Sequence, residues 1–230
     1  MAEIQVYDRL RRYAQDNQSN LMSIVALSLL LTGCSSAYYG TMEKLGYPKR
    51  DLMVSRVESA RDAQQEAKEE FKSALEKFSS VLQVDGGALE DKYDQLKTAY
   101  DKSSARAESV RDRIEAVEDV SEALFEEWQS ELDQYTSDSL RRSSARKLKQ
   151  TRRQYAQLIS AMKRAEKKME PVLLAFHDQV LFLKHNLNAG AIASLQTELV
   201  SVEAEVNALI RDMEASIKEA DAFIGAMAKE

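Results

Sequence analysis

Apolar residues recur at alternating steps of three and four through most of the region from residue 50 to residue 228. This spacing keeps one side chain after another on the same side of a helix and is typical of a coiled-coil seam. Val57, Phe71 and Phe78 belong to the first seam, with Gln64 in the same register. We therefore predict four long helices, whose seams run over 57–81, 89–135, 148–183 and 192–227.

The breaks between the seams indicate short turns. Asp85-Gly86-Gly87 separates the first two seams and Asn188-Ala189-Gly190 the last two, since glycines favour turns. The polar cluster 135–139 offers helix N-caps, so a turn is expected near residue 137. Pro171 lies inside an in-phase seam, so we expect a kink there and no break. With only 7 Gly and 2 Pro, the chain is predicted to be all-α, a long antiparallel four-helix coiled-coil bundle.

Charge also favours a turn near residue 137 over one unbroken helix. Acids dominate 112–133, opposed only by Arg113, whereas 141–153 holds seven bases and no acid. A hairpin would lay the two runs side by side, and we expect most of the bases to pair with carboxylates there. A straight helix would be about 145 Å long at 1.5 Å per residue and would leave both runs unpaired.

The predicted helices differ in length, so one hairpin should project. The second helix is about 47 residues long and the first about 31, which gives an overshoot of about 24 Å. The projecting tip would point back towards the start of the bundle. Four basic residues near it are candidates for contact with anionic lipid, namely Arg141, Arg142, Arg146 and Lys147.

An apolar run over 21–31 is too short to span a membrane but has the length of the apolar core of an export signal. It follows Arg9, Arg11 and Arg12 and ends in Leu31-Thr32-Gly33-Cys34, which resembles a bacterial lipobox. Met22 is an alternative start, but it would leave no basic segment before the run.

The lipobox resemblance implies that Cys34, the single cysteine, is lipidated and becomes the first residue of the mature chain. Ser35, the residue that follows, implies transfer to the outer membrane. Several acyl chains would anchor the protein firmly, facing the periplasm. The chain then divides into a signal peptide (1–33), the lipidated cysteine with a tether (34–49) and the helical bundle (50–230).

A lipobox followed by four heptad-patterned helices resembles an uncharacterised family of coiled-coil lipoproteins from gammaproteobacteria, defined by a domain of unknown function. The resemblance covers nearly the whole chain. It implies the envelope location and the helical fold, and it supplies no activity.

Several classes of activity are disfavoured by the residues themselves. A net charge of −6 argues against a nucleic-acid partner. His177 and His185 lie eight apart, unlike a metal-binding pair on one helical turn, and no phosphate-binding loop or catalytic constellation stands out. We therefore expect no enzyme, cofactor or metal.

Two hypotheses remain for the function. The first is a lipid-anchored scaffold, spacer or interaction module with an envelope protein as partner. The second is a module that contacts or remodels membranes through the basic tip. The oligomeric state stays open.

Overall fold

The computed structural model describes residues 39, 42, 46, 48–83, 89–186 and 189–228. The lipobox residues Leu31, Thr32, Gly33 and Cys34 lie outside this range. Residues Arg50–Glu230 form one compact unit.

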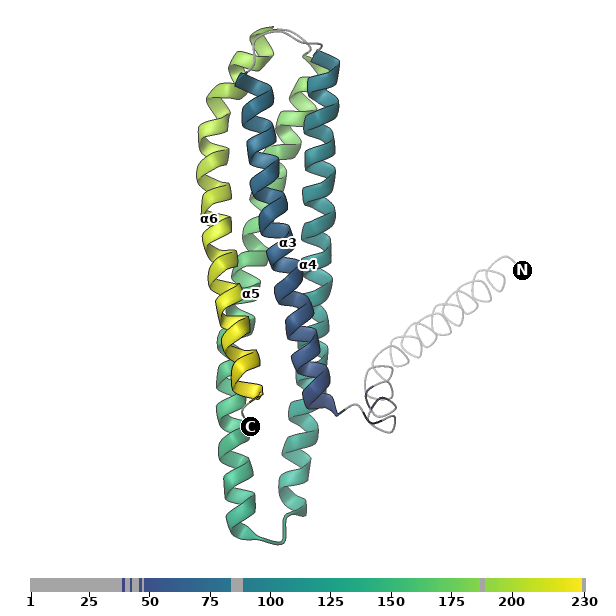
Figure 1. The fold of residues 1–230 in the computed structure, drawn as a ribbon, viewed down its shortest axis with the longest axis vertical. Coiled ribbons are helices and arrows are strands. Elements are labelled where there is room, and N and C mark those ends of the chain that lie inside the picture. The colour runs from purple at the N-terminus through teal and green to yellow at the C-terminus, as the bar shows by residue number, and fades with distance from the viewer. Residues whose placement is uncertain are drawn as a thin grey trace, which may run out of the picture. The chain divides into compact units, whose positions relative to one another are not determined.

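The described residues of this unit form four long helices and no strand. The helices are α3 (Lys49–Gln83), α4 (Leu89–Glu131), α5 (Asp138–His185) and α6 (Ala189–Met227), with the 3₁₀ turn η1 (Leu132–Gln134) between α4 and α5. Successive helices alternate in direction and lie side by side (Figure 1). The predicted all-α antiparallel bundle is therefore confirmed.

Most of the seam residues fill the core of the bundle, as their spacing predicted. Val57, Phe71 and Phe78 are completely buried, and so is Gln64. The Phe176 ring of α5 stacks on Phe78 with centroids 4.5 Å apart, and its centroid lies 6.4 Å from that of Phe71. Burying rings of this size supplies much of the free energy that holds the helices together.

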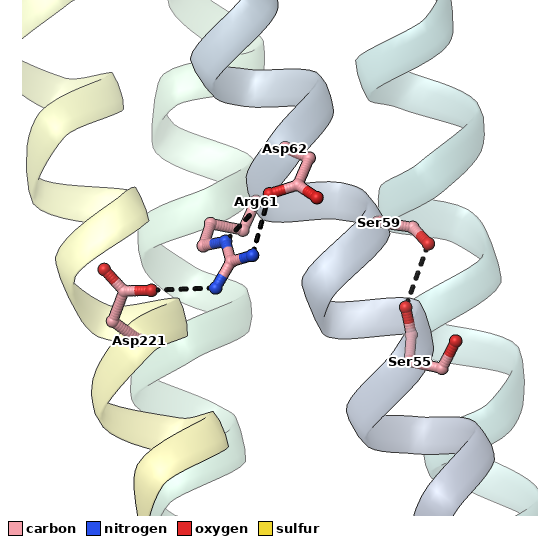
Figure 2. Close-up of polar contacts among 5 residues, drawn as sticks. All are labelled: Ser55, Ser59, Arg61, Asp62 and Asp221. Carbon is pink, nitrogen blue, oxygen red and sulfur yellow. Dashed lines mark hydrogen bonds and ion pairs between the residues drawn. The ribbon is translucent and has the colours of Figure 1, made fainter.

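Polar contacts join α3 to α6 along the outside of the bundle. Figure 2 shows the Arg61 guanidinium held between Asp62 of its own helix, at 2.8 Å, and Asp221 of α6, at 3.1 Å. These carboxylates raise the pKa of Arg61 above its ordinary value. All three side chains are partly exposed, so the pairs fix the register of the helices more than they stabilise the bundle.

The helix ends largely follow the predicted breaks, with two corrections. Ala189 and Gly190 were predicted to belong to a turn but lie in the first turn of α6. The predicted turn residues Asp85-Gly86-Gly87 and Asn188 lie outside the described residues. α5 continues unbroken through Pro171, and a turn precedes Asp138, as expected. Tyr135 was predicted to close the seam of the second helix, but it is 40% exposed. The prediction was wrong because α4 ends at Glu131 and the 3₁₀ turn that follows changes the angular step per residue.

Candidate functional site

The hairpin of α4 and α5 continues past the first residues of α3 and the last residues of α6 (Figure 1). Arg50 at the start of α3 donates a hydrogen bond to the carbonyl of Met227 at the end of α6, so these two helices stop at the same level. In the register set by the Arg106–Glu66 ion pair, this level falls near residue 122 of α4. In the register set by the ion pair between Lys168 of α5 and Asp212 of α6, the end of α6 falls near residue 153 of α5.

We call residues 123–153 the arm. Its α5 side, from residue 138 to residue 153, is about 24 Å long at 1.5 Å per residue. The arm is a two-helix hairpin, whereas the rest of the unit has four helices (Figure 1). The overshoot predicted from the helix lengths is therefore present.

The tip of the arm is built by helix-capping chemistry. Ser137 has extended backbone angles and its side chain accepts a hydrogen bond from the Leu140 amide, at 3.5 Å. The negative charge of Asp138, in the first turn of α5, interacts favourably with the positive end of the helix dipole. Capping by serine and aspartate thus starts α5 without a glycine or proline.

Aromatic contacts hold the two sides of the arm together. Trp128 Nε1 donates a hydrogen bond to Ser144 Oγ at 2.8 Å. At the base of the arm, Phe125 packs edge-on against the ring of Tyr155, which lies in α5 two residues beyond the arm, with centroids 5.4 Å apart. Burial raises the pKa of the Tyr155 phenol, an effect that a hydrogen bond with Ser121 partly offsets.

The basic run makes fewer ion pairs than its neighbourhood predicted. Arg141 pairs with Asp138 of its own helix at 2.8 Å. Arg142, Arg146 and Lys147 are exposed and make no side-chain hydrogen bond or ion pair with a described residue. The hairpin does lay the acidic and basic runs side by side, but it gives these three bases no ion pair with a described residue.

Arg152 explains part of this difference. Its guanidinium donates to the carbonyl of Phe125 at 3.2 Å and lies 5.5 Å from the centre of the Phe125 ring. A guanidinium is stabilised both by a hydrogen bond to a carbonyl and by contact with an aromatic face. An arginine opposite an acidic helix can therefore make these contacts in place of an ion pair with a carboxylate. Four exposed basic side chains of the arm make no hydrogen bond or ion pair with a described residue and are available to a partner: those of Arg142, Arg146, Lys147 and Lys149.

Two large apolar residues near the tip are also exposed. Leu140 is 57% exposed and Tyr135 is 40% exposed. Sequence reasoning passed over Leu140, although a signal was present: it is the one large aliphatic residue between Ser137 and Lys147. The tip thus combines unpaired positive charge with exposed apolar surface.

The histidines lie elsewhere and do not meet. The His177 ring packs against Tyr100 with centroids 5.4 Å apart, and its Nδ1 lies 3.8 Å from Asp178. His185 lies in the last turn of α5. Within the described ranges, no three His, Cys, Asp or Glu side chains are grouped to hold a metal ion.

Comparison with known proteins gives a family but no activity. A family model described as "Protein of unknown function (DUF2959)" matches residues 38–227. No curated protein matches the chain. Among the described residues, none of the helices is both long and apolar enough to cross a membrane.

Proposed function

Since the chain belongs to the DUF2959 family, whose function is unknown, we propose that it is a non-enzymatic scaffold or interaction module of the bacterial cell envelope. The arm is the element that meets the partner. The observation that carries this proposal is the projection of the arm beyond the four-helix part (Figure 1).

The surface chemistry of the arm supports a contact role. Leu140 and Tyr135 keep apolar area in water at the tip, and exposed apolar groups ringed by charge are typical of interaction surfaces. Arg142, Arg146 and Lys147 would steer an acidic partner towards this end of the molecule. The remainder of the unit then serves as a stiff support of four packed helices.

Site-specific crosslinking in living cells tests the interaction role. A photoreactive amino acid replaces Leu140 in one strain and Val200 in another. Val200 is the control because it is 71% exposed and lies on α6, outside the arm. We expect a discrete crosslinked product from position 140 and none of the same mass from position 200. Absence of any product from position 140, or the same product from both positions, contradicts the proposal.

We propose further that the anchor is lipid on Cys34, in the outer membrane facing the periplasm. The support is the apolar run that ends in Leu31-Thr32-Gly33-Cys34, together with Ser35 as the next residue. Labelling with a fatty-acid analogue should mark the wild-type chain and leave Cys34→Ser unmarked. Equal labelling of the two chains would exclude the anchor, and fractionation of inner and outer membranes tests the location.

A second candidate function is contact with anionic lipid through the arm tip. It is favoured by the unpaired side chains of Arg142, Arg146 and Lys147, next to Arg141 and the exposed Leu140, because basic residues beside an apolar one bind charged interfaces. We expect the full chain carrying Cys34→Ser to sediment with anionic vesicles at low salt and to be released at high salt.

Charge reversal in the arm tests the contact with anionic lipid. Arg142→Glu with Arg146→Glu should abolish sedimentation with the vesicles. The matched control is Arg113→Glu with Lys167→Glu, two exposed bases in the four-helix part that make no described ion pair. If the control loses as much binding as the arm variant, or if the wild type does not sediment at low salt, lipid contact by the tip is excluded.

A further inference from the structure

A groove of about 610 Å³ lies between α5 and α6, away from the arm. Gln179 and Phe182 line it from α5, and Glu198 and Glu205 line it from α6. Its size is within the range of small-molecule sites. The α6 residues on its wall lie four, three and four positions apart, because they occupy one row along the helix: Ser194, Glu198, Ser201 and Glu205.

The buried end of Gln179 has no internal partner. The residue is 4% exposed, yet neither its Nε2 nor its Oε1 makes a hydrogen bond within the described chain. A buried amide without partners is costly, so such groups in native proteins are met by water or by a ligand. Gln179 is also one of the residues that line the groove, so a molecule bound there would lie beside the amide that lacks a partner.

The carboxylates that border the groove also lack ion pairs with Lys or Arg side chains of the described residues. Glu198 and Glu205 are exposed and form no ion pair with a described residue, and Asp178 contacts only the ring of His177, at 3.8 Å. They are not gathered closely enough to hold a metal ion. On α6, residues 198 and 205 are about 10 Å apart along the axis. Negative charges spaced in this way suit an elongated cation with more than one charged group.

We propose that the groove binds an aliphatic polyamine. The ammonium groups lie against Glu198, Glu205 and Asp178, and one of them donates to the Gln179 Oε1 at the buried side. The methylene chain packs on Phe182 and on Leu195, which also lines the groove. The site makes no use of the arm, so its failure would leave the proposed function untouched.

Calorimetric titration of the full chain with spermidine at low salt tests this site. We expect saturable binding by the wild type, with one spermidine per chain. Gln179→Leu keeps the side-chain volume but removes the amide, and it should weaken binding about tenfold. The same variant should unfold at an equal or higher temperature than the wild type, since it removes an unsatisfied buried group.

A pair of charge variants keeps the test independent of that core substitution. Glu198→Gln with Glu205→Gln should abolish binding, whereas Glu203→Gln with Glu219→Gln removes the same charge from α6 outside the groove and should leave it unchanged. The proposal is overturned if the wild type gives no saturable heat, which would mean that only water fills the groove. It is also overturned if both double variants lose binding equally, or if Mg²⁺ competes as strongly as spermidine does.

Discussion

Ser216 of α6 donates a hydrogen bond of 2.7 Å to the side-chain oxygen of Gln64 of α3, and both residues are completely buried in the core. The amide nitrogen of Gln64 has no partner among the described residues. This polar pair interrupts an otherwise apolar seam between the first and last helices. It therefore ties the register of α6 to that of α3 by a directional contact.

Ser216→Ala should destabilise the protein by about 1–3 kcal/mol, because it leaves the Gln64 oxygen buried without a donor. The double variant Ser216→Ala with Gln64→Leu should recover much of that loss, since no unsatisfied polar group remains. Urea unfolding measures both, with Ser130→Ala on the exposed surface as the control. A double variant less stable than Ser216→Ala alone would show that the pair contributes net stability.

Phe176→Ala should lower the free energy of unfolding by about 3–5 kcal/mol, the usual effect of removing a buried ring. The ring is completely buried and stacks on Phe78, so its loss leaves a cavity between α3 and α5. Leu174→Ala, two residues away and 54% exposed, is the matched control and should have little effect. Similar losses from the two variants would contradict the packing described.

Replacing residues 123–153 by a short flexible loop should leave a folded four-helix unit. The arm packs mainly on itself, through contacts such as the one between Trp128 and Ser144, whereas the core residues of α3 and α6 lie outside it. Circular dichroism should show helicity reduced only in proportion to the residues removed, with a cooperative thermal transition. A broad, non-cooperative transition would mean that the arm nucleates the bundle.

Tyr155 should make the protein less stable at high pH. Its pKa is raised by burial, so the folded state holds the phenolic proton more tightly than the unfolded state does. The stability that it contributes is fully present below its unfolded pKa of about 10 and is lost as the pH rises through the raised value. Tyr155→Phe should therefore show a smaller decline in unfolding free energy above pH 10, measured by urea unfolding across the alkaline range. An identical decline in both chains would show that the phenol is not buried in solution.

The heptad spacing was sufficient to predict the helices and most of the core. It did not identify two polar residues that are buried in the core. Ser216 fills the gap between Met213 and Ala220 in the fourth seam, and Gln179 is buried one turn before Leu183. Both positions keep the spacing of the apolar residues around them, as Gln64 does, but a serine or glutamine adds no hydrophobic signal of its own to the pattern.

The candidate site was foreseen in outline and missed in detail. Helix lengths and the run 141–153 predicted a projecting basic hairpin, and the hairpin is present (Figure 1). The predicted pairing with the acidic helix is not seen for Arg141, which pairs with Asp138, or for Arg152, which contacts a carbonyl and a ring. Such contacts depend on side-chain geometry that a count of charges does not give. The groove between α5 and α6 was not foreseen either, since it depends on how two distant segments lie against each other.

The hydrogen bond from Arg50 to the carbonyl of Met227 brings the first residue of the compact unit close to its last helical turn. Because the start of α3 and the end of α6 meet, the same four-helix core could be formed by a chain that begins at another helix. A short peptide could join α6 back to α3, and the chain could then be cut open in the segment 84–88 to give a circular permutant with the same core. The order in which the helices are synthesised would change, while every layer of the bundle would keep its neighbours.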